Sequence, residues 1–181
     1  MLDAAEALII ENGGDFEISE LAAAAGVSNG LAYHYFGSKD GLIGAVIDRF
    51  YARYSSVLDR EVDADIAWPV RERARLRETV DFLYSDPFAP TVFGALNHPG
   101  ALAKELELRS ALSARAARNI RSGQRRGHIS AEIDCDLAGA AIIGAVHSAM
   151  MVAMKLHPRP TSEQVTQQLW GMIRSAVGLQ V

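Results

Sequence analysis

The segment that decides the fold runs from residue 18 to residue 42 and reads ISELAAAAGVSNGLAYHYFGSKDGL. It opens with a predicted short helix whose inner face, at Leu21, Ala22 and Ala25, is apolar and mostly small. Gly26 follows and supplies the left-handed backbone that a tight turn needs. Because small side chains let a second helix cross closely over the first, the segment predicts a helix-turn-helix.

The second helix of this motif presents a polar and aromatic outer surface. Ser28 caps its N-terminus, while Ala32 and Phe36, one helical turn apart, point inwards. The outward residues are uncharged but rich in hydrogen-bonding groups: Asn29, Gly30, Tyr33 and His34. Such a surface suits a helix that enters the major groove of DNA. A plain hairpin in an all-α core is the alternative, but a core helix has little reason to expose an aromatic cluster.

Residues 25–42 resemble the signature of the tetracycline-repressor-like (TetR) family of transcriptional regulators. The opening LDAA at residues 2–5 and the ENG at residues 11–13 are similar to the first helix of that family, so the resemblance covers residues 2–47. A weaker similarity follows at residues 120–141, which resemble the boundary between the seventh and eighth helices of many members.

The resemblance implies an all-α fold of about nine helices in two domains. A three-helix, helix-turn-helix DNA-binding head is expected at residues 1–46, and a larger helical ligand-binding and dimerisation body at residues 47–181. The implied function is a transcriptional regulator, expected to be a repressor, whose homodimer leaves a palindromic operator in double-stranded DNA when an unidentified small-molecule effector binds. Within the head, Lys39 would hold a phosphate together with backbone N–H groups. The residues expected to contact DNA are Ser28, Asn29, Gly30, Leu31, Tyr33, His34, Tyr35 and Lys39.

Three departures from the family pattern concern DNA binding. Ser19 stands where members often carry a basic residue. Leu31 stands where threonine or another small residue is common, and it either meets a thymine methyl group or packs inwards. The first 47 residues hold seven acidic residues and one basic residue, Lys39, without the usual basic arm. Two explanations stay open: the native start lies upstream, or the head binds DNA weakly with a shallow salt dependence.

Helical periodicity extends along almost the whole chain, and strand patterns are scarce. N-caps are expected at Ser28, Ser38, Asp134 and Thr161, the last in a capping box with Gln164. Together with glycine and proline stops, these signals predict helices at residues 3–11, 18–25, 28–35, 39–60, 69–84, 90–96, 101–126, 135–155 and 162–177.

The eighth and ninth predicted helices are expected to form the homodimer interface. Residues 137–154 carry no formal charge and approach the length that spans a membrane, but His147, Ser148 and two glycines interrupt them. A helix buried in a core or a subunit interface explains the stretch better, and no membrane partner is expected. Two such helices per subunit would make a four-helix contact. The expected contact residues are Ala138, Ala141, Ile142, Ala145, Ala149 and Val152, followed by Val165, Leu169, Met172, Ile173 and Val177.

The body offers only general signals for a ligand pocket. The candidates are Tyr84, Phe88, Phe93, His98, Arg118, His147, Met150, Met151 and Met154. Ordinary core packing is the alternative for the apolar members, and a solvated helix face is the alternative for Arg118. Four alternate arginines at residues 71–77, interspersed with Glu72 and Glu78, predict a salt-bridged surface.

Neither a catalytic site nor a metal or cofactor site is expected. The chain has no His-x-x-His or Cys-x-x-Cys pair and no phosphate-binding glycine loop. The single cysteine, Cys135, lies too far from His147 on one predicted helix to form a nucleophile–base pair, and it fits a reducing cytoplasm. The net charge of −4 leaves one alternative function, a helical ligand-binding or interaction protein whose DNA-binding head is weak or non-functional.

Overall fold

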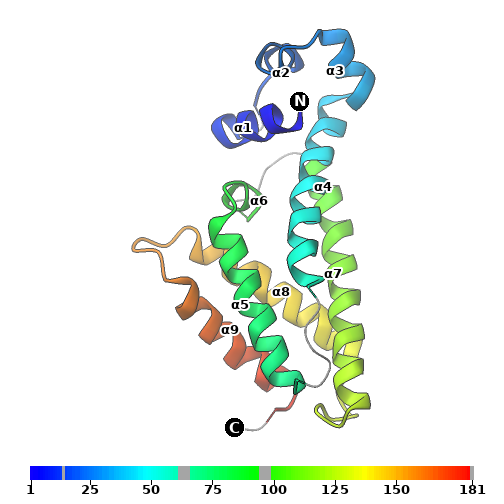
Figure 1. The fold of residues 1–181 in the computed structure, drawn as a ribbon, viewed down its shortest axis with the longest axis vertical. Helices are drawn as coiled ribbons and strands as arrows, with labels where there is room; N and C mark the ends of the chain where they lie inside the picture. Colours follow the sequence, from blue (N-terminus) through cyan, green and yellow to red (C-terminus); the bar gives the residue numbers. More distant parts are fainter. Residues whose placement is uncertain (14, 61–65, 94–98, 180–181) are drawn as a thin grey trace. The chain divides into compact units, whose positions relative to one another are not determined.

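The computed structural model describes residues 1–13, 15–60, 66–93 and 99–179. Within these ranges the chain forms helices and no strand, which confirms the all-α prediction. Except where the sixth predicted helix runs into residues 94–96, outside the described ranges, the predicted ends agree with the observed ones to within two residues. Figure 1 shows the nine helices of the described residues: α1 (Leu2–Asn12), α2 (Ile18–Ala25), α3 (Asn29–Phe36), α4 (Lys39–Leu58), α5 (Trp68–Ser85), α6 (Ala89–Phe93), α7 (Pro99–Arg125), α8 (Cys135–Ala153) and α9 (Ser162–Ala176).

The helices begin at capping residues that are visible in the sequence. The side chains of Ser28, Asp134 and Thr161 each accept hydrogen bonds from backbone N–H groups in the first turn of α3, α8 and α9. At the start of α4, the Ser38 hydroxyl accepts a hydrogen bond of 3.1 Å from the N–H of Gly41. These contacts satisfy N–H groups that have no partner within the helix, and they confirm the predicted caps.

The chain divides into two compact units that do not follow a single cut in the sequence. The first unit comprises Met1–Arg53 and Asp86–Glu107, and the second comprises Tyr54–Ser85 and Leu108–Val181. Helices α4 and α7 therefore contribute residues to both units. The domain boundary expected after residue 46 falls inside α4.

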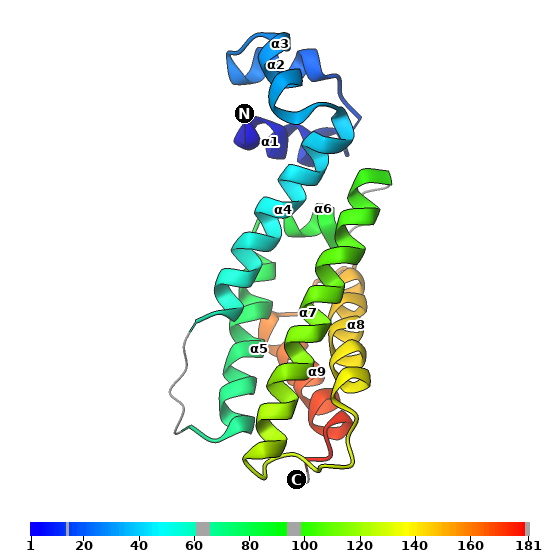
Figure 2. The same ribbon diagram turned by 90° about the vertical axis from the view of Figure 1, so that its right-hand side faces the viewer.

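In the first unit, α2 contacts both α1 and α3 (Figures 1 and 2). The side chains of Ile9, Leu21 and Ala32 are fully buried there. Ala22 and Ala32 belong to one buried cluster, so the small residues predicted to bring the two helices of the motif together do so. Burial of these apolar side chains, rather than the propensity of such short helices, holds the head together.

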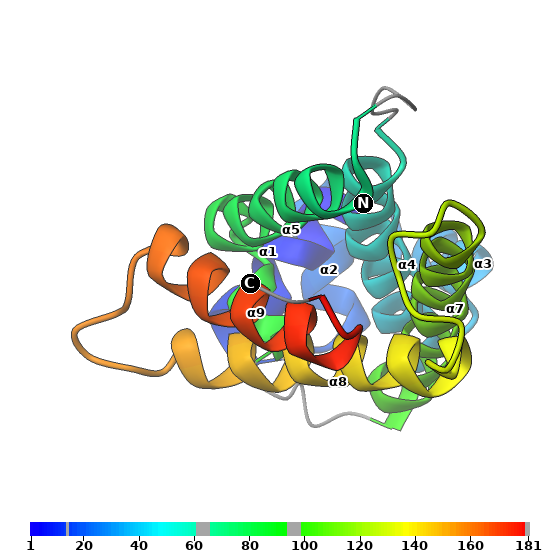
Figure 3. The same ribbon diagram turned by 90° about the horizontal axis from the view of Figure 1, so that it is seen from below.

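In the second unit, α9 packs between α5 and α8 (Figure 3). Helix α8 lies directly against the C-terminal half of α7 at Gly139 (Figure 2). A Cβ atom on Gly139 would lie 2.7 Å from the backbone N of Ala117 and 2.8 Å from the carbonyl O of Ser113. Glycine is therefore required at this crossing, because any side chain would push α7 and α8 apart.

Helix α8 leaves much of its apolar surface uncovered. It is the one helix in the described part of the chain that is long and apolar enough to cross a membrane, by length and composition only. Only 28% of its apolar window is buried, and Leu137 and Val152 are 72% and 58% exposed. The sequence indicated a helix buried in a core or in a subunit interface; within a single chain it is not a buried core helix. Its uncovered face is thus available to a partner.

Candidate functional site

The first candidate site is the outer surface of α3. Gly26 and Gly37, which follow α2 and α3, have φ angles of 65° and 69°, in the left-handed region that favours glycine. Between these two ends, Ala32 is the one residue of α3 that is fully buried. This small contact fixes α3 against α2 and leaves most of its side chains facing outwards.

Seven of the eight residues expected to contact DNA lie on α3 or at its cap, and all seven are exposed. Tyr33 and Tyr35 are 53% and 66% exposed, and the ring of Tyr35 meets that of His34 edge to face. Leu31 is 40% exposed, so it does not pack inwards and its side chain is free to meet a base. The remaining exposed members are Ser28, Asn29 and Gly30. Their contacts with DNA stay a prediction.

Lys39, the eighth expected contact, is the first residue of α4. Its Nζ lies 5.2 Å from the centroid of the buried Phe16 ring, and the side chain as a whole is half-buried. A cation–π contact of this kind restrains the ammonium group beside the end of α3. Lys39 is therefore held in place near the exposed surface of α3, as a phosphate contact requires.

Two acidic residues of the head are neutralised by arginines that follow residue 47. Asp3 and Glu6 of α1 form ion pairs with Arg49 and Arg53 of α4. The hydrogen bond from Arg49 lowers the pKa of the Asp3 carboxyl below its ordinary value. A charge count that stops at residue 47 misses these two ion pairs, but it also misses Asp48 and the Asp86 that shares Arg53, so the first unit stays acidic.

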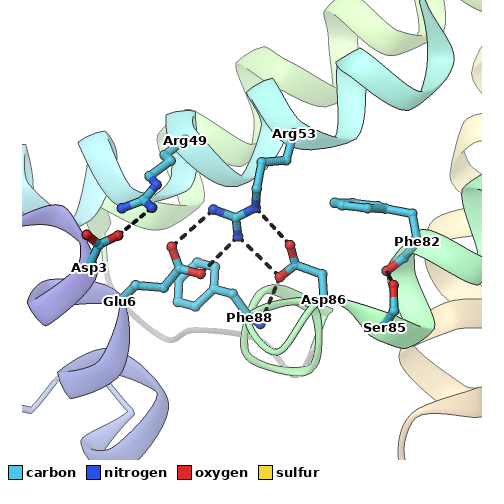
Figure 4. A network of polar contacts seen from close by, with 8 residues as sticks. All are labelled: Asp3, Glu6, Arg49, Arg53, Phe82, Ser85, Asp86 and Phe88. Atoms are coloured by element: carbon cyan, nitrogen blue, oxygen red, sulfur yellow. Dashed lines mark hydrogen bonds and ion pairs between the residues drawn. The ribbon is translucent and has the colours of Figure 1, made fainter. Parts of the chain in front are cut away.

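Arg53 is the centre of a polar network that joins three segments of the first unit (Figure 4). Its guanidinium donates to both carboxylate oxygens of Glu6, at 2.9 and 3.1 Å, and to both of Asp86, at 2.8 and 3.2 Å. Asp86 also accepts a hydrogen bond of 2.9 Å from the N–H of Phe88, just before α6. One side chain therefore ties α1 and the start of α6 to α4.

The geometry of this network keeps Arg53 charged. Burial disfavours the charged guanidinium, but hydrogen bonds and charge attraction from Asp86 and Glu6 outweigh it and raise the pKa of Arg53 above its ordinary value. Only arginine presents a planar fork that can engage two carboxylates in this way. No pattern in the sequence indicated the role of Arg53, because its two partners lie 33 and 47 residues away along the chain.

The second candidate site is a cavity of about 120 Å³ within the second unit. Apolar side chains dominate its walls, and Trp68 and Trp170 contribute indole rings. The lining comes from α5, α7, α8 and α9 and from the last residues of α4. An apolar cavity with a few polar groups is the usual form of a small-molecule site.

The charged groups in the cavity wall are already paired. Glu72 accepts hydrogen bonds from Arg71 (3.0 Å) and from Arg75 (2.5 and 2.6 Å). Arg115 pairs with Asp59 from the adjoining part of α4. Burial raises the pKa of the Tyr54 hydroxyl, which also lines the cavity, to about 12, so it is neutral at physiological pH.

The salt-bridged surface predicted at residues 71–77 is only partly correct. The ion pairs form, but Arg71 is buried and Glu72 and Arg75 line the cavity, whereas Arg73 and Arg77 are exposed. Alternation of charge along the chain does not show which side of a helix faces the core. A buried arginine is tolerated here because Glu72 neutralises it.

None of the eight described residues among the nine proposed for a ligand pocket lines this cavity. Phe88 and Phe93 are buried in the first unit, where both rings meet Phe50 edge to face. Tyr84 donates a hydrogen bond of 2.9 Å to the carbonyl of Pro160. Arg118 is exposed, and His98 lies outside the described residues. Met150 is buried in α8. His147 and Met151, also in α8, and Met154, directly after it, are half-buried.

The head is similar in sequence to known bacterial regulatory proteins. Residues 1–46 match the family of bacterial regulatory proteins called tetR. An HTH-type transcriptional repressor of Mycobacterium tuberculosis is 39% identical over 67 residues, which cover 36% of this chain and 36% of that protein. The similarity thus spans about a third of the length of this relative.

Solved structures share the fold over nearly the whole chain. SmeT, the repressor of the Stenotrophomonas maltophilia multidrug efflux pump SmeDEF, superposes with a TM-score of 0.81 and 20% identity over 99% of this chain and 91% of its own. A complex of SmeT with triclosan has also been solved. FadR from Bacillus subtilis in complex with stearoyl-CoA gives a TM-score of 0.76 and 17% identity over 97% of both chains.

Proposed function

From the match of residues 1–46 to the tetR family of bacterial regulatory proteins, we propose that the protein is a homodimeric transcriptional repressor. Its α3 helices bind a palindromic operator in the cytoplasm, and a small molecule bound in the body releases the DNA. The observation that supports this proposal is the capped helix α3, which buries Ala32 and exposes seven residues at its cap and along its length, five of them with hydrogen-bonding side chains.

The experiment that tests DNA binding is the substitution Tyr33→Ala. Removal of this exposed ring is expected to weaken binding to the operator roughly 10- to 100-fold, since a specific contact in the major groove contributes about 1–3 kcal/mol. Affinity is measured by fluorescence anisotropy on DNA from the region upstream of the protein's own gene, at two salt concentrations. Leu106→Ala, at a residue 55% exposed on α7, is the matched control and should bind like the parent protein. Equal affinity of the Tyr33 variant would contradict the assignment of α3.

The uncovered face of α8 supports a dimer through this helix. Leu137, Ala141 and Val152 lie on this face, and all three are exposed in the single chain. Pairing α8 and α9 of two subunits would cover this apolar surface. A dimer also places two recognition helices on half-sites one helical turn apart, about 34–36 Å.

Leu137→Asp is expected to convert the dimer to a monomer without loss of helix content. A carboxylate in an apolar interface would lose its hydration without a partner. Sedimentation velocity measures the change in mass, and circular dichroism checks the fold. Val70→Asp, at a residue 63% exposed on α5, should leave the dimer intact. If Leu137→Asp stays dimeric, the interface lies elsewhere.

The body is proposed as the effector-binding part, with the cavity of the second unit as its site. Proteins of this fold hold different ligands, triclosan in SmeT and stearoyl-CoA in FadR, so the lining and not the fold selects the ligand. Helix α4 carries Arg53 of the first unit and, next in the chain, Tyr54 of the cavity wall. We propose that α4 and the α6 region couple occupancy of the cavity to the head. An effector that binds tightly and leaves DNA affinity unchanged would contradict this coupling.

The second candidate function is a helical ligand-binding protein whose head no longer reads DNA. The single basic residue among the first 47 favours it. The salt titration above separates the two functions. Specific binding that weakens as salt rises supports a working repressor, whereas no binding even at low salt supports the second candidate.

A further inference from the structure

We propose that the cavity of the second unit binds a single-ring aromatic compound that carries a hydroxyl group, that is, a phenol. This inference rests on the proposed function only in taking the body as the effector-binding part. The inference is supported by the size, the apolar walls and the charges of the cavity, and by two polar side chains in its wall.

The size of the cavity matches one ring. Its volume of about 120 Å³ is close to that of the engineered cavities of about 150 Å³ that bind benzene in another protein. A second fused ring or a long alkyl chain would extend into the open side of the cavity, where it buries less apolar surface. A single ring therefore fits the cavity best.

The walls favour an aromatic ring over an aliphatic one. Trp68 is buried, and its indole N–H donates a hydrogen bond of 3.2 Å to the carbonyl of Asn119, which fixes the orientation of the ring. Trp170 adds a second indole, and Ile142 and Val146 of α8 supply aliphatic surface. Fixed indole rings offer stacked or edge-to-face contacts to an aromatic ligand without further loss of side-chain freedom.

The charges in the wall exclude a cationic ligand. Glu72 is engaged by both Arg71 and Arg75, and Arg115 is engaged by Asp59, so no carboxylate of the wall is left for a ligand cation. An ammonium ligand would lose its hydration without gaining a counter-charge. The ligand therefore carries no positive charge.

Two polar side chains in the wall are available to a hydroxyl group. Thr79 is buried at 4% exposure, and Asn119 is half-buried. Within the described part of the chain, neither side chain has a hydrogen-bond partner of its own. A phenolic hydroxyl can donate to one of these groups and accept from the other.

The test is calorimetric titration of the full chain, without DNA, at neutral pH, with four compounds: phenol, benzene, benzylamine and 2-naphthol. Phenol is expected to bind most tightly. Benzene, which lacks the hydroxyl group, should bind about tenfold more weakly. Benzylamine, a cation at this pH, and 2-naphthol should each bind about tenfold more weakly than phenol, because of charge and size respectively. Tighter binding of benzylamine or 2-naphthol, or no binding of phenol, would overturn the inference.

Variants locate the site. Thr79→Val keeps the shape of the side chain. It should weaken the binding of phenol about tenfold and leave the binding of benzene unchanged. Thr166→Val is the matched control, because this threonine is also buried and unpaired but does not line the cavity. Ala116→Phe should fill the cavity and abolish binding of both compounds. If phenol affinity falls equally in both threonine variants, or falls in neither, the inference is overturned.

The outcomes separate this inference from the proposed function. A protein that binds its operator but not phenol overturns the ligand class alone. A protein that binds phenol in the cavity but no operator overturns the proposed repressor alone, because the titration contains no DNA.

Discussion

Gly41→Ala is expected to destabilise the head by about 3 kcal/mol and to abolish operator binding, although it adds only one methyl group. A Cβ atom on Gly41 would lie 2.2 Å from the carbonyl O of Phe36 and 3.3 Å from its carbonyl C. Both are backbone atoms, so no side-chain rotation can relieve the contact. The turn between α3 and α4 would have to open, and the hydrogen bond of 3.1 Å from the Gly41 N–H to Ser38 would be lost. Since α3 ends at Phe36, its exposed surface would move with the turn.

The matched control is Gly44→Ala, one turn further along α4. A Cβ at Gly44 meets no atom within 4 Å, so this variant should gain about 0.5–1 kcal/mol from helix propensity alone. Urea denaturation followed by circular dichroism measures both stabilities, and fluorescence anisotropy measures operator affinity. If the two variants unfold at the same urea concentration, the close approach at Gly41 does not constrain the turn.

The helices of this protein are predictable from sequence because the signals are local. Ser28, Asp134 and Thr161 cap the helices that follow them, and Gly26 and Gly37 end helices in the left-handed backbone that glycine tolerates. Both kinds of signal act within a few residues, so they can be read from the order of the amino acids alone.

The exposed surface of α3 was also predictable, for a different reason. Periodicity shows which residues of an amphipathic helix point inwards, and burial of Ala32 with exposure of Tyr33 follows from it. The family resemblance then assigned a role to the exposed residues. The resemblance could not supply the ion pairs near them, since Arg49 and Arg53 bind Asp3 and Glu6 from another helix.

The cavity was not predictable, because long-range packing creates it. Trp68 and Trp170 are distant in the sequence but line one cavity. Charged residues such as Glu72 and Arg75 are ordinarily exposed, and only their mutual neutralisation allows them to line it. The aromatic and methionine residues that were expected to line a pocket pack elsewhere, as Phe88 does in the core of the first unit.

Arg53→Met is expected to lower the free energy of unfolding by about 2–3 kcal/mol, less than the full 3–5 kcal/mol of a broken buried pair because Arg53 is 31% exposed. Methionine retains the apolar stem of the side chain but removes the charge. The carboxylates of Glu6 and Asp86, only 13% and 6% exposed, would then lie close together without a counter-charge. Loss of the guanidinium group would also remove the link between α1, α4 and the start of α6, so operator affinity should fall as well.

Arg49→Met is the matched control, one turn earlier on the same helix and also paired with a carboxylate of α1. Its partner Asp3 is 85% exposed, so water solvates both charges after the substitution and the unfolding midpoint should hardly change. Arg53→Lys is expected to recover only part of the loss, because an ammonium group cannot engage two carboxylates as a planar fork does. Equilibrium denaturation at neutral pH compares the three variants. Equal losses for Arg49→Met and Arg53→Met would mean that burial of the network contributes nothing, and full recovery by lysine would mean that charge alone, without the fork geometry, holds the three segments together.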